Sequence, residues 1–346
     1  TLSLVRKFCQ ASSSFALLAL ISAGLISCAG NTVKKTTTDT ASSGISDAET
    51  KTETEAIPEN LPNVELSADL MYKLMLSDLA RQQNNNDLAL AALADSAIET
   101  RDPRLAAQAT RLAVITNQFP TAIQMAMLWQ ELSPNNIDVY QTLGNLLVVE
   151  NQPQQAIVYY SKALSLSDEE SRSKLLKQIS STLIRYSSQS QALTLIEQLA
   201  TEYPDSADVA LAHASVASKL KEYEVANRAI NRTLALDPDN EDAAVFKFSL
   251  LVLQNNDAEA EEFANKYLKK HPKSLVLRTV LARYYLESNK LDAAEKEYLI
   301  IHRQDETSVI APMALALIRM DNKKYTDATM YLEKVLELQS NNDLAR

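Results

Sequence analysis

The stretch that decides the fold runs from residue 140 to residue 164 and reads YQTLGNLLVVENQPQQAIVYYSKAL. Its apolar residues recur three and four positions apart on both sides of a polar centre, which predicts two amphipathic helices joined by a short turn. Small residues stand at Gly144, Ala156 and Ala163, where they would let two antiparallel helices approach closely. The larger Leu143 and Tyr160 would fill the space around them. The stretch therefore predicts one helical hairpin.

The same pattern recurs with a period of 34 residues. Its alanine is found in register at Ala192, Ala226, Ala260, Ala294 and Ala328. A proline that would end the second helix follows twelve residues later, at Pro134 after Ala122 and again at Pro204, Pro238 and Pro272. One interval, from Ala156 to Ala192, is 36 residues long, so we expect two inserted residues between Ser167 and Ser171. A fixed period of this length predicts a stack of repeated hairpins.

The pattern resembles the tetratricopeptide repeat family at the positions quoted above. Pentatricopeptide repeats are one residue longer and usually basic, and HEAT repeats are longer still, so both fit less well. The resemblance implies an all-α fold, a right-handed superhelical solenoid of about eight tetratricopeptide helix-turn-helix repeats whose first helices line a concave groove. We expect sixteen helices between about Asp69 and Asn342. The first hairpin, within residues 66–101, is diverged, and its expected core is Leu74, Leu79, Leu88 and Leu93.

The first 27 residues have the plan of a secretory signal peptide. Arg6 and Lys7 precede an apolar run at residues 15–26, which is about half the length of a membrane-spanning helix. The ending Leu25-Ile26-Ser27-Cys28 resembles the lipobox of bacterial lipoproteins, which implies that Cys28 receives a diacylglycerol and acyl chains such as palmitate and becomes the first mature residue. The alternative is a signal anchor with an incidental cysteine. Ala29 after the cysteine resembles outer-membrane sorting, so we expect the periplasmic face of the outer membrane.

The chain then divides into a tether and the repeat array. Residues 28–64 are rich in Ser, Thr and charged residues and lack an apolar period, so we expect a disordered spacer, with modification of its hydroxyls as an alternative. Residues 65–346 hold the array. Residues 343–346 look like the start of another first helix, so we expect the array to be truncated at its C-terminal end, within a longer protein. Cys9 would leave with the signal peptide, so no disulfide is expected.

Composition and charge exclude several classes of function. The chain has four glycines, too few for a glycine-rich phosphate loop or a dinucleotide fingerprint. Its formal net charge is −10, and loss of the leader would make it two charges more negative. A chain this acidic is repelled by nucleic-acid phosphates, so no nucleic-acid partner is expected.

The sequence predicts no enzyme, no cofactor and no metal site. The histidines His213, His271 and His302 fall in different repeats at unrelated positions, and none is paired at metal-binding spacing. His213 is expected as a buried core residue. No Ser–His–acid or Cys–His arrangement can be assembled locally. Any catalytic domain would have to lie beyond Arg346.

The predicted partner site is the groove formed by the first helices of the last three repeats. In tetratricopeptide proteins, positions 2, 5, 9 and 12 of the first helix usually face the groove. In this chain, the corresponding residues are Val245, Ser249, Val252, Val276, Thr279, Arg283, Ile310, Met313, Leu317 and Met320. Aliphatic and methionine side chains are typical of peptide-binding grooves. The alternative is that several pack against neighbouring helices.

A second candidate surface is a small basic patch formed by Lys174, Lys177 and Arg185. It could hold a carboxylate of a partner, although a solvated helix face is the simpler alternative. The carboxylate clamp of chaperone-binding repeats does not match, because Gln141 replaces its first lysine and only Asn145 agrees.

The layout of leader, tether and repeats resembles the long outer-membrane lipoproteins that recruit a carboxyl-terminal processing protease. The stretch at residues 100–106, TRDPRLA, also resembles that group. The resemblance implies a non-enzymatic scaffold that brings a periplasmic protease to peptidoglycan hydrolases, because a scaffold with two partners raises their effective concentration. The alternative is an assembly or pilotin-type lipoprotein that chaperones a secretin or an outer-membrane barrel protein. Self-association is also possible for such an array.

Overall fold

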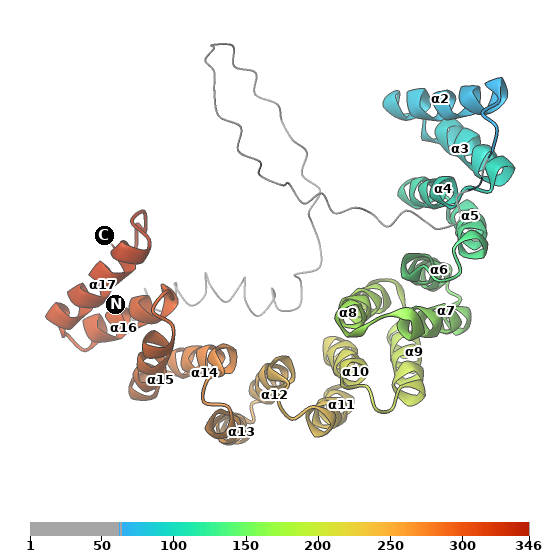
Figure 1. Cartoon of the computed structure of the whole chain (residues 1–346). Helices are drawn as coiled ribbons and strands as arrows, with labels where there is room; N and C mark the ends of the chain where they lie inside the picture. The colour runs from blue at the N-terminus through green and yellow to red at the C-terminus, as the bar shows by residue number, and fades with distance from the viewer. Residues whose placement is uncertain (1–61, 63, 346) are drawn as a thin grey trace, which may run out of the picture. The chain divides into compact units, whose positions relative to one another are not determined.

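The structure is a computed structural model that describes residue 62 and residues 64–345. Over these residues the chain forms sixteen α-helices and no β-strand (Figure 1). This confirms the all-α repeat fold and the predicted helix count. The predicted leader, Cys28 and nearly all of the predicted tether lie outside the described residues.

The described residues divide into two compact units, with the boundary between Ser187 and Ser188. The helices of the N-terminal unit are α2 (Ala68–Gln82), α3 (Asn86–Thr100), α4 (Pro103–Ile115), α5 (Phe119–Leu132), α6 (Ile137–Val149), α7 (Pro153–Leu166) and α8 (Glu169–Tyr186). The helices of the C-terminal unit are α9 (Gln189–Glu202), α10 (Ala207–Lys219), α11 (Tyr223–Leu236), α12 (Glu241–Leu253), α13 (Asp257–Lys270), α14 (Leu275–Glu287), α15 (Leu291–Gln304), α16 (Ile310–Asp321) and α17 (Tyr325–Leu338).

Even-numbered helices are the first helices of the repeats, and odd-numbered helices are the second. Repeat positions are counted so that Ala156 is position 20, which makes Ile137 position 1. The predicted insertion is confirmed, because α8 has 18 residues where α6 and α10 have 13. The additional residues lengthen the start of α8, where Asp168 caps the helix through a hydrogen bond from the backbone N–H of Ser171.

The small residues at position 20 of the pattern are buried in both units. Every alanine at position 20, from Ala122 to Ala328, is buried. Gly144, at position 8, lies so close to the ring of Tyr160, at position 24, that an added Cβ would be 2.4 Å from Cε1. Position 8 is therefore small because position 24 is large.

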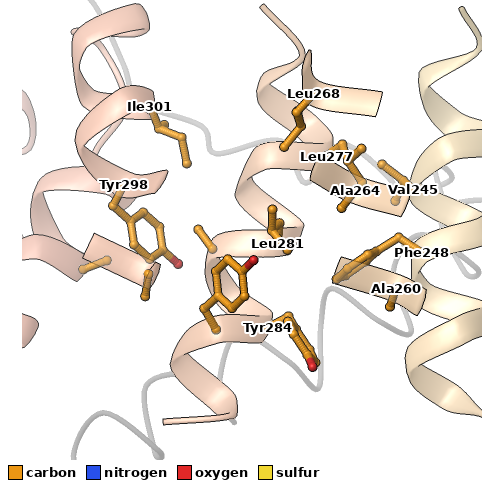
Figure 2. Packing of buried hydrophobic residues seen from close by; sticks show 14 of the residues in the cluster. Val245, Phe248, Ala260, Ala264, Leu268, Leu277, Leu281, Tyr284, Tyr298 and Ile301 are labelled. Atoms are coloured by element: carbon orange, nitrogen blue, oxygen red, sulfur yellow. The ribbon is translucent and has the colours of Figure 1, made fainter. Parts of the chain in front are cut away.

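One repeat reverses this size order. In α12 position 8 is Phe248, and position 24 in α13 is Ala264 (Figure 2). Both residues are buried in one cluster, to which Leu277 and Tyr284 of α14 also belong. The ring of Phe248 meets that of Tyr284 edge to face, with the ring centres 5.5 Å apart. A large residue is thus paired with a small one here as at Gly144 and Tyr160, with the two positions exchanged.

In seven of the eight repeats, the turn between the two helices uses a left-handed residue at position 15; the exception is Ser187 between α8 and α9, with a φ of −104°. In five repeats this residue is asparagine, and in two it is lysine, Lys221 and Lys323. Left-handed φ costs an ordinary L-residue about 1–2 kcal/mol, and asparagine tolerates it better because its side chain bonds the local backbone. The asparagines are Asn84, Asn117, Asn151, Asn255 and Asn289.

We predict that Lys221→Asn raises the free energy of unfolding by about 0.5–1 kcal/mol, because φ at this position is +65°. The measurement is the urea midpoint of the full chain. The control is Lys266→Asn on the exposed side of α13, where asparagine is a poorer helix former than lysine and the midpoint should fall. A fall in both variants would contradict the role of the turn.

The first hairpin corrects part of the predicted core. Leu93 is buried and Leu74 is partly buried, but Leu79 and Leu88 are exposed. The reason is the register of α3, whose buried alanine, Ala89, precedes Ala122 by 33 residues rather than 34. Small residues pack the two helices instead, among them Ser77 on α2 and Ser96 on α3.

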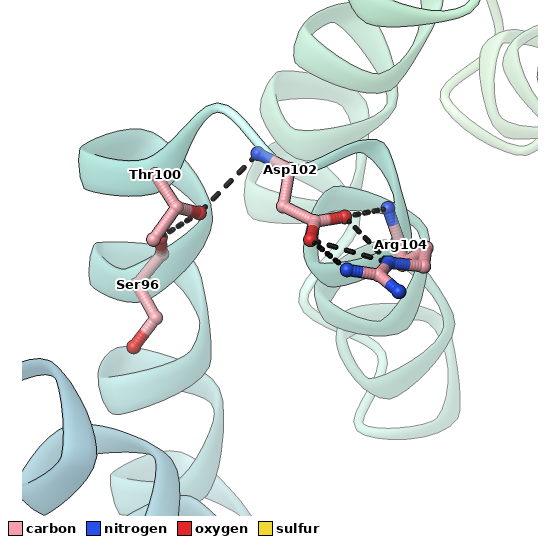
Figure 3. A network of polar contacts seen from close by, with 4 residues as sticks. All are labelled: Ser96, Thr100, Asp102 and Arg104. Carbon is pink, nitrogen blue, oxygen red and sulfur yellow. Dashed lines mark hydrogen bonds and ion pairs between the residues drawn. The ribbon is translucent and has the colours of Figure 1, made fainter. Parts of the chain in front are cut away.

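The stretch at residues 100–106 comprises the end of α3, the two-residue connection Arg101-Asp102 and the first turn of α4 (Figure 3). Arg101 ends α3 in the left-handed region, and Asp102 caps α4 by accepting a hydrogen bond of 2.8 Å from the backbone N–H of Arg104. Burial raises the pKa of Asp102, but the hydrogen bonds from the side chain and backbone of Arg104 outweigh burial, and the pKa lies below its usual value. The hydrogen bonds between Asp102 and Arg104 therefore stabilise the connection between the two helices.

Candidate functional site

The predicted groove residues lie on α12, α14 and α16 of the C-terminal unit. In this unit the first helices α10, α12 and α14 form one layer and the second helices α11 and α13 form another (Figure 1). The most exposed groove residues are Val276, Ile310 and Met320, with 47%, 56% and 37% of their surface accessible. Five others are partly exposed, namely Ser249, Val252, Thr279, Arg283 and Leu317.

Two predicted groove residues are buried and do not belong to this surface. Val245 packs into the cluster with Phe248 and Leu277, and Met313 packs against Val335. Both are at position 5, three residues before position 8, and residues three apart on a helix share a face. In α12 and α16, the side chain at position 5 therefore lies on the buried side of the helix.

The partly exposed hydroxyl groups of this face are used within their own helices. Ser249 donates to the carbonyl oxygen of Val245 at 2.8 Å, and Thr279 donates to that of Leu275 at 2.7 Å. What remains for a partner is mainly aliphatic and thioether surface. Leu253, at position 13 of α12, is also exposed on this helix, but it was not among the groove residues predicted from the sequence. Its apolar side chain directly after the predicted groove residue Val252 could have indicated it.

The basic patch lies on α8 of the N-terminal unit, and all three of its side chains are exposed. Lys174 and Lys177 occupy positions 2 and 5, and Arg185 follows two turns later on the same side of the helix. The guanidinium of Arg185 lies 5.7 Å from the ring centre of the exposed Tyr186. The helix therefore presents three cations and one aromatic ring to solvent.

The deeply buried charges of the C-terminal unit form a structural pair. Nη1 of Arg278, on α14, lies 2.5 Å from Oε2 of Glu297, on α15, and both side chains are almost fully buried. Nη2 of Arg278 also donates to the carbonyl oxygen of Pro272 at 3.1 Å. Arg278 is at position 4, where Tyr140 of α6 donates in the same way to Pro134 at 2.8 Å. Arg278 thus occupies the position of Tyr140 and makes the equivalent hydrogen bond to the turn that precedes its helix.

The histidines lie apart and none joins a catalytic arrangement. His213 on α10 is half-buried, and burial lowers its pKa, so it is neutral at pH 7. His271 stacks on Tyr267, with ring centres 4.3 Å apart, and His302 on α15 meets Tyr331 edge to face. Within residue 62 and residues 64–345, no group of three His, Cys, Asp or Glu side chains is placed to hold a metal ion. In the same part of the chain, no helix is both long and apolar enough to span a membrane.

Comparison with known proteins identifies the repeats. Tetratricopeptide repeat models match residues 137–170, 211–274 and 313–342. A tetratricopeptide-repeat-containing protein of Pseudomonas aeruginosa is 31% identical over 117 residues, which are 34% of this chain and 20% of that protein. The chain thus spans about a fifth of the length of the curated relative that it matches.

Solved structures of repeat proteins are also similar at low identity. MamA of Desulfovibrio magneticus, from residue 41 to its end, is 18% identical with a TM-score of 0.38, over 49% of this chain and 97% of that one. A tetratricopeptide repeat protein of Parabacteroides merdae is 16% identical with a TM-score of 0.37, over 70% and 95% of the two chains. The chain thus contains tetratricopeptide repeats at these residues, and its described part has an all-α repeat fold.

Proposed function

We propose that this protein is a non-enzymatic scaffold that binds other proteins through the first-helix face of its C-terminal unit. The observation that carries the proposal is the exposed apolar surface of Leu253, Val276, Ile310 and Met320 on three successive first helices. Tetratricopeptide repeats are protein-interaction modules, and exposed apolar groups on one face of an otherwise charged chain mark such a surface.

At a finer level, the proposed scaffold is a lipid-anchored adaptor on the periplasmic face of the outer membrane. It would bring a carboxyl-terminal processing protease to peptidoglycan hydrolases. The support for this level is the lipobox-like ending at Cys28, the Ser- and Thr-rich segment after it and the stretch at residues 100–106. An anchor confines both partners to one surface and raises their effective concentration.

The test of the partner site is affinity capture from solubilised envelopes with the full chain as bait. A serine protease together with peptidoglycan hydrolases is the expected catch. Val276→Asp and Ile310→Asp should each weaken capture at least about tenfold, because a charge is placed in an apolar contact. Both positions are exposed, so the helix content by circular dichroism should not change.

The matched control is Val158→Asp, which places the same charge at an exposed valine of α7. Equal loss of capture at Val158 and Val276 would contradict the assignment of the groove. Capture of a secretin or a barrel protein instead of a protease would replace the adaptor with an assembly factor and would leave the groove assignment intact.

A separate prediction tests the anchor. The chain should incorporate a labelled fatty acid in a Gram-negative host, and Cys28→Ala should abolish the label because the thiol that receives the diacylglycerol is gone. The control is Cys9→Ala, which should keep the label because Cys9 belongs to the predicted leader. Label that persists in Cys28→Ala would contradict the lipobox.

A further inference from the structure

The first helix of the array, α2, exposes a row of large apolar side chains. Tyr72, Met75 and Leu79 have 63%, 58% and 50% of their surface accessible. They are three and four residues apart, so they form one stripe along the helix, called here the α2 stripe. Leu70, Ser77 and Ala80, on the other side of α2, are buried. The stripe is thus the outer side of a helix whose inner side is already packed.

The residues of the α2 stripe occupy positions at which the later first helices α12 and α14 pack against the preceding hairpin. They are positions 3, 6 and 10. In α12 these positions are Ala243, Phe246 and Leu250, which pack against residues of α10 and α11. In α14 they are Leu277, Val280 and Tyr284, which pack in one cluster with residues of α12 and α13. The α2 stripe therefore has the chemistry of a stacking surface, and no hairpin among the described residues is stacked on it.

The residues just before α2 do not have the pattern of a repeat hairpin. Residues 29–61 are rich in hydroxyl and charged side chains and lack the apolar period that a hairpin needs. Val64 and Leu66, shortly before α2, and Met71, within it, are exposed as well. An apolar surface of this kind on a charged protein favours association.

Charge and spacing favour a second copy of this chain as the occupant. The chain carries a formal net charge of −10, but α2 holds two acidic and two basic residues and is neutral overall. Because α2 has no net charge of its own, the helix adds no net repulsion when two acidic chains meet there. One of the bases, Lys73, is held by Asp69 and Glu99, each at 2.7 Å, so it stays beside the stripe rather than in it.

The spacing of the stripe is also self-complementary. If two α2 helices lie antiparallel about a two-fold axis beside Met75, Tyr72 of one copy lies level with Leu79 of the second copy, and the two Met75 side chains meet at the axis. Flexible methionine side chains adapt well to such a contact. We propose that the α2 stripe is a homodimerisation surface through which two copies pair as antiparallel helices. Its small area makes the dimer weak, with dissociation in the micromolar range.

The first experiment measures the mass of the full chain in detergent by analytical ultracentrifugation across a concentration series. A dimer that dissociates in the micromolar range is expected, and Met75→Asp should weaken it at least about tenfold, while Met330→Asp, at an exposed methionine of α17, should not. A chain that stays monomeric throughout, or equal effects of the two substitutions, would overturn the proposal. Circular dichroism should show unchanged helix content in both variants.

The second experiment tests the antiparallel geometry in a chain whose Cys9 and Cys28 are replaced by serine. Met75→Cys should form a disulfide between copies under mild oxidation, because the two side chains meet at the axis. Met330→Cys should not. Cross-linking of Met330→Cys alone, or of Met75→Cys only to Met330→Cys in a mixture of the two chains, would overturn the symmetric pairing. Loss of cross-linking only when another protein is added would identify a competing partner and would still support the stripe as the contact surface.

Discussion

Replacing Arg278 by alanine should lower the free energy of unfolding by about 3–5 kcal/mol. Arg278 and Glu297 are almost fully buried, and the two side chains are 2.5 Å apart. Without the guanidinium, the carboxylate of Glu297 stays in a low-dielectric interior with no counter-charge, and the carbonyl oxygen of Pro272 loses its donor. The measurement is the urea midpoint together with the slope of the transition, because the slope reports how much surface is exposed on unfolding.

Two further variants separate the buried pair from a general effect of losing charge. Arg278→Met combined with Glu297→Leu should be far less destabilised than Arg278→Ala, because no uncompensated charge remains. Lys334→Ala removes one partner of an exposed ion pair with Glu337 and should change the midpoint little. If the double variant were the least stable of the three, the loss would come from packing rather than from the unpaired carboxylate.

Truncating Phe248 to alanine should cost about 3–5 kcal/mol, the range typical of a fully buried phenylalanine. The opposite residue, Ala264, is already small, so no neighbour is placed to fill the space. The contact of Phe248 with the ring of Tyr284 is lost as well. The cavity would lie at the contact of α12, α13 and α14, which the urea midpoint of the full chain should register.

The reversed pair gives this prediction a sharper form. Adding Ala264→Phe to Phe248→Ala recreates the size order found at Gly144 and Tyr160, with the small residue first, and should recover part of the lost stability. Alone, Ala264→Phe should destabilise by overpacking. The coupling energy from this cycle measures the complementarity directly. If the two single losses simply added, positions 8 and 24 would not form a complementary pair in this repeat.

The repeat pattern predicted most of the fold. The alanines at position 20, the twelve-residue offset to the prolines and the insertion before α8 all follow from residue identity and spacing, because close helix contacts admit only small side chains. The left-handed conformation at position 15 is also visible in the sequence, because most residues with this conformation at position 15 are asparagine. This marker has the same 34-residue spacing in successive regular repeats.

The candidate site was less predictable. The repeat positions that usually face the groove predicted Val245 and Met313 on the surface, whereas both residues are buried. In the first hairpin, Leu79 and Leu88 were expected in the core and are exposed. An apolar residue at the edge of a helix face can turn either way, and a rotation of the helix by a few tens of degrees decides which.

The sequence by itself determined the class of fold and the number of hairpins among the described residues, because both depend on spacing within one or two helices. The tertiary structure decided which apolar residues remain accessible, that Arg278 meets Glu297 on the next helix, and that the stacking positions of α2 are left uncovered. These features depend on how neighbouring helices are rotated and separated. That geometry results from the packing of many side chains at once, and no short stretch of sequence encodes it.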